Sequence, residues 1–159
     1  MIMDIADFHG LMTINGVDPY VLYRVWLFDK MGEHSNINAL LKPAPIKVNN
    51  PINFREVPGR QYPTDLKPIT DEREFTLNFA CHGDNDADFI LNYFNFITFL
   101  KSGATNTGWL TIQLANIPSL SFKCFVKSPD SYDSKTYMDE KDIVVGTFKV
   151  IFTEPEPNF

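Results

Sequence analysis

The clearest pattern along the chain is an alternating segment followed by an amphipathic one. Between Glu72 and Cys81 the side chains alternate between two faces, one mainly apolar and one mainly polar, with the period of a half-buried β-strand. Residues that cap helices follow, namely Asp84, Asn85 and Asp86. From Ala87 to Leu100 an apolar stripe recurs at helical spacing, formed by Ile90, Tyr93, Phe94, Ile97 and Leu100. This pattern predicts a helix that packs on a sheet and ends at Gly103.

The N-terminal part of the chain predicts a β-hairpin. The apolar segment from Leu11 to Val17 contains Asn15-Gly16, a dipeptide typical of tight turns, and a second apolar segment from Tyr20 to Phe28 follows. Asp18-Pro19 is interpreted as part of the connection between the two strands. The segment from Tyr20 to Phe28 is apolar on both faces of a strand. We therefore expect one face to be covered by the domain's own core and the other by a second layer or another subunit.

Prolines interrupt the region from residue 29 to residue 70, namely Pro43, Pro45, Pro51, Pro58, Pro63 and Pro68. Each proline fixes φ and removes a hydrogen-bond donor, so no long element is expected there. Residues 46–48 and 52–57 are predicted to form short edge strands around an Asn49-Asn50 turn. A loop this long in a compact domain is typically functional or ordered by a partner.

The C-terminal half predicts three more strands, at Trp109 to Leu114, Leu120 to Lys127 and Asp142 to Thr153. The polar stretch 128–142 is predicted to be a loop. Together the elements indicate an α+β protein, mainly an antiparallel β-sandwich or partly open barrel with one helix packed on it. We expect residues 1–159 to form a single domain with an irregular Pro-rich loop at about 29–70 and flexible ends.

Composition narrows the class of protein. The 159 residues are 44% hydrophobic and include 14 Phe, enough for a Phe-rich core that needs no metal or disulfide. The net charge of −6 argues against a surface that grips nucleic-acid phosphates. Cys81 and Cys124 fall on apolar strand faces, so free thiols are expected. No stretch approaches the ~20 apolar residues of a membrane helix and no secretory leader is recognisable, so the chain is expected to stay in the cytosol, or to leave it only inside an assembly or by cell lysis.

Candidate chemical sites are sparse in this sequence. The densest group of metal-ligand types is His82 beside Cys81, followed by Asp84, Asp86 and Asp88. The group lacks the second Cys or His pair of a zinc site, and the Gly and bidentate Glu of a calcium loop, so we interpret its acidic residues as helix caps. Neither a nucleophile motif nor a phosphate-binding glycine motif is present. The sequence therefore predicts no enzyme activity, no catalytic residue, no metal and no cofactor.

Four segments in a particular order resemble a known family, namely Ile14-Asn15-Gly16-Val17, Val57-Pro58-Gly59-Arg60, the strand Arg73 to Cys81 and the helix Asp88 to Leu100. In this arrangement residues 11–153 resemble the N-terminal, ring-forming domain of phage distal tail proteins, which shares its sandwich-plus-helix fold with tail-tube proteins. The sequence departs from the family in two respects. The additional C-terminal domain of longer members is not expected here, and residues 30–53 are interpreted as a specific insertion.

The resemblance implies a structural subunit of a phage or prophage-derived tail, forming a hexameric ring at the tail tip or tube with a sheet from each copy lining a central channel. Its partners would be its own copies and other tail or baseplate proteins, with DNA only in passage and no membrane. Its location would be the virion tail, assembled in the cytoplasm of the bacterial host. The Pro-rich segment would reach an adjacent subunit. The interface residues expected on this basis are Tyr20, Leu22, Arg24, Trp26, Phe28, Val57, Arg60, Ile143, Val145 and Ile151.

Two other interpretations fit the same residues. In the first, the protein is a monomeric module in which sheet and helix enclose a small apolar ligand, with Trp26, Trp109 and Phe122 lining the pocket. In the second, all the aromatic residues belong to the core and function lies elsewhere. The apolar character of both faces from Tyr20 to Phe28 distinguishes the ring subunit from the monomeric module. A monomeric ligand-binding module would place polar residues on its outer face, whereas a ring subunit would not.

Overall fold

The structure is a computed structural model that describes residues 10–29, 34–138 and 143–159. The elements run in chain order as β1 (Met12–Ile14), α1 (Pro19–Tyr23), β2 (Val25–Leu27), α2 (Ser35–Leu41), β3 (Arg73–Gly83), α3 (Asp86–Ser102), the 3-10 turn η2 (Ala104–Asn106), β4 (Leu110–Leu114), β5 (Ile117–Met138) and β6 (Ile143–Glu154). In the described part of the chain no helix is long and apolar enough to cross a membrane.

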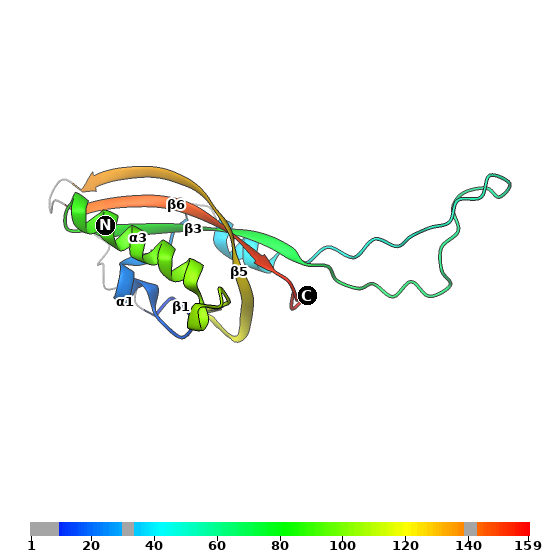
Figure 1. Cartoon of the computed structure of the whole chain (residues 1–159), viewed down its shortest axis with the longest axis horizontal. Helices are drawn as coiled ribbons and strands as arrows, with labels where there is room; N and C mark the ends of the chain where they lie inside the picture. The colour runs from blue at the N-terminus through cyan, green and yellow to red at the C-terminus, as the bar shows by residue number, and fades with distance from the viewer. Residues whose placement is uncertain (1–9, 30–33, 139–142) are drawn as a thin grey trace.

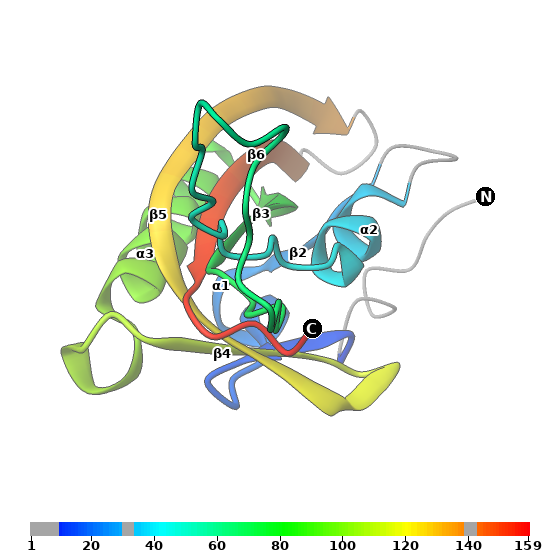
Figure 2. The ribbon, with the colours of Figure 1, turned by 90° about the vertical axis from the view of Figure 1, so that its right-hand side faces the viewer.

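The strands form one six-stranded sheet in the order β1-β4-β5-β6-β3-β2, with every neighbouring pair antiparallel. The long strand β5 curves around the molecule and joins the β1-β4 part of the sheet to the β6-β3-β2 part (Figure 2). This nearly closed, barrel-like sheet with helices confirms the predicted fold class. The main helix is α3, and α1 and α2 are two short helices that the sequence pattern did not predict.

The core lies between the sheet and α3. Phe96 of α3 packs edge-on against Phe79 of β3, with ring centroids 5.2 Å apart, and contacts Phe148 of β6 at 5.9 Å. The strand predicted from Glu72 to Cys81 and the helix predicted from Ala87 to Leu100 are confirmed as β3 and α3. Asn85 caps α3, because its side chain accepts a hydrogen bond from the Asp88 amide at 2.8 Å. The helix ends at Gly103, where φ is +62°.

The buried stripe of α3 differs from the predicted one. Phe89, Phe96 and Leu100 are buried, whereas Ile90 is 45% exposed and Phe94 60% exposed. The helix carries apolar residues around most of its circumference, and one sheet covers only part of it. The spacing of apolar residues alone could not distinguish the stripe that packs on the sheet from the stripe that remains uncovered.

The strand predicted from Tyr20 to Phe28 is wrong for its first half. Pro19–Tyr23 is the helix α1 and only Val25–Leu27 is a strand, which pairs with β3 instead of with β1. Asn15 and Gly16 do form a tight turn with positive φ, but β1 pairs with β4. The missed signal was Asp18-Pro19, because Asp is a preferred N-cap and Pro a preferred first helical residue.

The loop predicted for residues 128–142 is also wrong, because β5 continues to Met138. Residues 139–142 lie outside the described ranges. Pairing of β5 with β6 shifts register between Val126 and Ser128, between Pro129 and Ser131, and between Tyr132 and Ser134. Each β-bulge adds an unpaired residue, so the strict alternation that identifies a strand is lost, and a bulge also tolerates a proline.

The Pro-rich region contains one short helix and one long projection. Residues 43–70, here called the arm, leave the body after α2 and return at the start of β3, extending along the long axis of the molecule (Figure 1). Residues 46–48 and 52–57 do not pair around Asn49-Asn50. Instead Ile46 pairs with Thr70 and Ile52 with Gln61 as isolated bridges, and the chain turns at residues 55–59.

Candidate assembly surfaces

The arm exposes its apolar side chains. Each of them is between 42% and 87% exposed, namely Ile46, Val48, Ile52, Phe54, Val57, Tyr62, Leu66 and Ile69. The outgoing and returning segments of the arm are joined by few backbone hydrogen bonds. In one of them the Lys47 amide donates to the Ile69 carbonyl at 2.8 Å. Exposed apolar side chains that gather on one segment of a soluble protein typically mark a contact site for a partner. The arm is therefore the first candidate contact surface.

The arm and the rest of the molecule differ in charge. The arm has four basic and two acidic residues, namely Lys47, Arg55, Arg60, Lys67, Glu56 and Asp65, and so carries a net +2. Because the whole chain carries −6, the remaining residues carry −8. Opposite charges on two surfaces of one chain favour contact between the arm of one copy and the body of another.

The root of the arm is fixed by a buried ion pair. The Arg73 Nε atom lies 2.5 Å from Glu154 Oε2, and the two side chains are 5% and 0% exposed. Arg73 also donates from Nη1 to the Lys42 carbonyl at 2.6 Å, at the point where the arm leaves the body. Its guanidinium lies over the rings of Phe75, Phe122 and Phe159 at 5.1 to 5.6 Å. These contacts tie both ends of the arm to the core.

The C-terminal segment packs at the same root. The Ala44 amide donates to the Phe159 carbonyl at 2.9 Å, and Asn158 donates through its side chain to the Ser121 carbonyl at 2.8 Å. The direction in which the arm leaves the body is thus set by contacts from α2, β3, β6 and the last residues of the chain.

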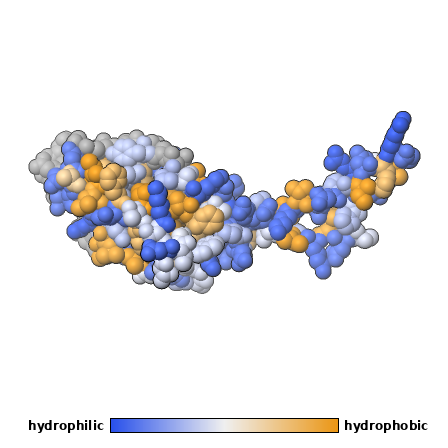
Figure 3. Space-filling model, viewed as in Figure 1, coloured by the Kyte–Doolittle hydropathy of each residue, from blue (hydrophilic) through white to orange (hydrophobic). Residues whose placement is uncertain are grey.

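A second apolar surface, here called the helix face, covers the outer sides of α1 and α3. Its side chains are 45–60% exposed and are Val21, Leu22, Ile90, Leu91 and Phe94. The two helices meet through Tyr23, whose ring lies 5.2 Å from that of Phe99. Figure 3 shows hydrophobic residues gathered over these helices and along the arm.

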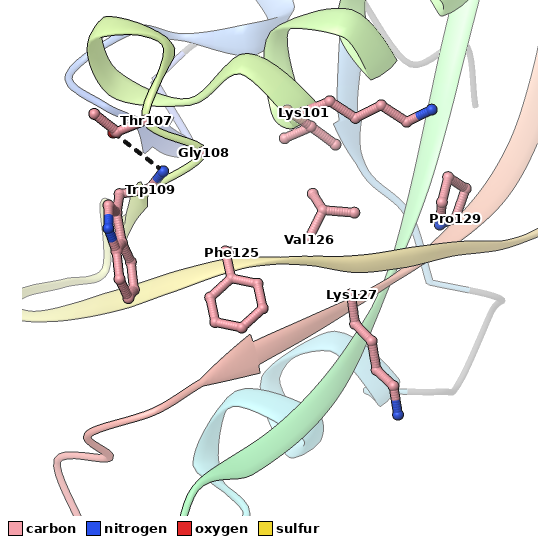
Figure 4. A pocket seen from close by; sticks show the side chains of 9 residues that line it. Lys101, Thr107, Gly108, Trp109, Phe125, Val126, Lys127 and Pro129 are labelled. Atoms are coloured by element: carbon pink, nitrogen blue, oxygen red, sulfur yellow. Dashed lines mark hydrogen bonds between the residues drawn. The ribbon is translucent and has the colours of Figure 1, made fainter.

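A third surface is a groove of about 450 Å³ beyond the C-terminal end of α3. Val126 lies at its centre, with Lys101 on one side and Trp109 and Phe125 on the other (Figure 4). The rings of Trp109 and Phe125 meet edge-on at 5.6 Å. Lys127 also lines the groove, but its Nζ atom lies 2.6 Å from Glu74. The sequence patterns did not identify this groove, because its residues come from three separate elements.

The expected interface residues are spread over several places in the structure. Leu22 and Arg24 are exposed on and after α1, and Val57 and Arg60 are exposed near the tip of the arm. Trp26, Phe28, Val145 and Ile151 are half-buried. Tyr20 and Ile143 are buried within one copy, at 2% and 9% exposure. The structure does not gather these residues into one patch.

The buried titratable groups belong to the core. Burial, and secondarily the negative charge of Asp88, raises the pKa of the Cys81 thiol to about 12. Burial, and secondarily Glu154, raises the pKa of Cys124 to about 12, so neither thiol is a nucleophile near neutral pH. Both cysteines are free, as predicted. Within the described ranges no group of three or more His, Cys, Asp or Glu residues is placed to hold a metal ion.

His82 is a buried residue whose side-chain nitrogens both lack a hydrogen-bond partner. Its ring packs 5.8 Å from that of Tyr20 and 5.6 Å from that of Trp26. Burial, and then the positive charge of Arg24, lowers the pKa of His82. A neutral imidazole between two aromatic rings is a core residue here.

The aromatic residues considered for a ligand pocket lie in different environments. Phe122 is fully buried, Trp26 is half-buried against His82, and Trp109 is 38% exposed at the groove. The small-ligand interpretation requires these three residues to line one cavity. In the structure they do not.

The fold described above, a bent antiparallel sheet with one long helix, is similar to that of a solved structure. That structure is the Dit protein of phage SPP1, described as a paradigm of the hub adsorption apparatus in phages that infect Gram-positive bacteria. The match has a TM-score of 0.57 with 14% sequence identity, and it covers 92% of this chain and 50% of that chain. The chain thus spans about half the length of that structure, and at this identity the likeness establishes a common fold.

No protein-family model matches the sequence, and no curated protein matches it.

Proposed function

We propose that this protein is a structural subunit of a phage or prophage-derived tail, and that its copies form a ring at the tail tip or in the tube. The likeness in fold to the SPP1 Dit protein supports the tail role. The resemblance of the sequence motifs to distal tail proteins supports the same role independently of the fold, and it supplies the hexameric ring as the expected assembly.

The observation that carries the proposal is the arm. Its exposed apolar side chains have no cover within the described chain, yet its root is rigidly fixed by Arg73 and Glu154. A segment that is firmly rooted and carries exposed apolar side chains along its length is suited to lie on another molecule. Burying one large apolar side chain contributes about 1.5–3 kcal/mol, so even partial burial of the arm would hold two copies together.

Contact between an arm and a body joins two different surfaces. Such an interface is head-to-tail, and it closes into a ring when the rotation between successive copies divides a full turn. The +2 arm and the −8 remainder of the chain supply the charge complementarity for this contact. Among the expected interface residues, Leu22, Arg24, Val57 and Arg60 are accessible to a neighbour.

The acidic body also suits the proposed central channel. A surface of net negative charge repels nucleic-acid phosphates, so DNA would pass without adhering. Other tail or baseplate proteins would contact the two faces of the ring, and the assembled virion tail would be the protein's location.

The proposal is tested by the assembly state of the purified protein. Sedimentation velocity across a wide concentration range should show a species larger than the 18.2 kDa chain, and electron microscopy should show closed rings. The double variant V48D/F54D, which places charges on the apolar arm, should remain monomeric. A matched control, N50D/T64D, adds the same charges at polar arm positions and should still assemble. A wild-type protein that stays monomeric at all concentrations would contradict the proposal.

A further inference from the structure

The groove beyond α3 is basic although the body around it is acidic. Outside the arm the chain has 10 basic and 18 acidic residues, counted from totals of 14 and 20, yet Lys101, Lys123 and Lys127 all lie at or beside this groove. Lys127 is paired with Glu74. In the described part of the chain neither Lys101 nor Lys123 has a carboxylate within ion-pair distance. Two unpaired ammonium groups therefore flank one groove.

The lining of the groove combines charge with aromatic surface. The Lys123 Nζ atom lies over the Trp109 ring, 4.9 Å from its centroid, and Trp109 is 38% exposed. In Figure 4, Lys101 and Trp109 lie on opposite sides of Val126. A groove with an apolar floor and cations on two sides fits a short acidic segment, whose carboxylates would meet the lysines and whose backbone would cover the rings.

The arm of a neighbour does not fit this groove, because the arm carries +2. An acidic segment lies at the other end of the same helix, where Asp84, Asp86 and Asp88 precede or begin α3. The helix has 17 residues and is therefore about 25 Å long. Within one copy the acidic turn is too far from the groove to enter it, but the acidic turn of a second copy is not.

We infer that the groove formed by Lys101, Trp109, Phe125 and Val126, with Lys123 beside it, binds the acidic turn 84–88 of the next copy. This inference rests on the proposed ring and identifies a second contact in it, separate from the arm. Each copy presents a basic groove at one end of α3 and an acidic turn at the other, which is the polarity that a head-to-tail ring requires.

Charge reversal on each side tests the contact. The variants K101E/K123E and D84K/D86K should each lower the association constant about tenfold or more, because each places like charges opposite one another. An equimolar mixture of the two variants should regain association, since every groove then meets a turn of opposite charge. The variant K101R/K123R keeps the charge and should associate like the wild type. Sedimentation velocity measures all four samples, and melting temperatures check that each variant is folded.

The outcomes separate this inference from the proposed function. If the wild type forms rings and K101E/K123E forms them equally well, the groove does not bind the acidic turn and the inference is overturned, while the ring stands. Failure of the mixture to regain association also overturns it, and indicates an occupant other than a second copy, such as an anionic glycan. If the wild type is monomeric, the proposed ring and this contact both fail.

Discussion

Arg73 connects the arm to the core through a charge that is almost completely buried. Its partner Glu154 is 0% exposed, and one oxygen of that carboxylate and one nitrogen of the guanidinium have no hydrogen-bond partner. A buried charge is costly when it is left alone, so each member of this pair depends on the other. The alternating pattern of β3 placed Arg73 on the apolar face, but no sequence feature indicated Glu154 as its partner.

We predict that Arg73→Met destabilises the fold by about 3–5 kcal/mol, because it leaves Glu154 as an unpaired buried carboxylate. Urea denaturation measures the change in the free energy of unfolding. Glu74→Gln, which breaks the exposed pair with Lys127, serves as the control and should cost no more than about 1 kcal/mol. Adding Glu154→Leu to Arg73→Met should recover much of the loss. Equal effects of Arg73→Met and Glu74→Gln would contradict the assigned role.

His82 links the stability of the fold to pH. Burial lowers the pKa of His82 in the folded state below its ordinary value of 6.5, so between these two values the unfolded chain binds more protons than the folded one. The contribution of His82 to stability is therefore present above about pH 6.5 and is lost as the pH falls toward the folded pKa.

We predict that the free energy of unfolding decreases for the wild type between about pH 7.5 and about pH 5.5, and that His82→Phe reduces this decrease. Phe keeps the ring contacts with Tyr20 and Trp26 without a titratable group. Denaturant titrations at both pH values give the comparison. An identical pH dependence in the variant would show that His82 does not titrate on unfolding.

At the scale of elements, local signals identified the structure where they agreed with tertiary packing. Asn85, Gly103 and Asn15-Gly16 predicted a cap, a helix end and a turn, because each depends on only a few neighbouring residues. The helix α1 was missed because its five residues are too few to display a helical period. The second half of β5 was missed because its bulges interrupt the alternation.

The assembly surfaces could be predicted only in part. The prolines indicated an irregular segment suited to contact a partner. The sequence could not reveal that the two ends of this segment lie side by side at the body, where Arg73 contacts Lys42. The spacing of apolar residues on α3 predicts that they face the core, whereas the structure places Ile90 and Phe94 on the helix face. An exposed contact surface and a buried one use the same residue types.

The arm is expected to contribute little to the stability of the body. We predict that replacing residues 46–70 with Asn-Gly, a dipeptide suited to a tight turn, changes the free energy of unfolding by no more than about 1 kcal/mol. The Asp71 amide already donates to the Pro45 carbonyl at 2.7 Å, so the two ends are close enough to join. Calorimetry measures the transition. A loss of cooperative unfolding would show that the arm is part of the folding unit.

At the scale of the whole molecule, the arm carries a net positive charge and the rest of the chain a net negative charge. Complementary charges mainly set the rate and the register of association, whereas apolar burial supplies most of its free energy. The two contributions respond differently to salt, because screening shortens the Debye length to about 3 Å at 1 M ionic strength without weakening apolar contact.

We predict that self-association weakens as salt rises from about 0.05 M to about 1 M, but is not abolished. Sedimentation at a fixed protein concentration across this range provides the measurement. An association that strengthens steadily with salt would mean that apolar burial acts alone and that the charge division has no part in assembly.

The way the arm joins β3 also has a mechanical consequence. The arm continues directly into β3, which pairs with β6 along its full length from Arg73 opposite Glu154 to Gly83 opposite Val144. Antiparallel hydrogen bonds lie perpendicular to their strands. A pull on the tip would therefore load this ladder in shear, with all its bonds sharing the force, instead of unzipping them one at a time. The arm should therefore act as a tether that withstands tension.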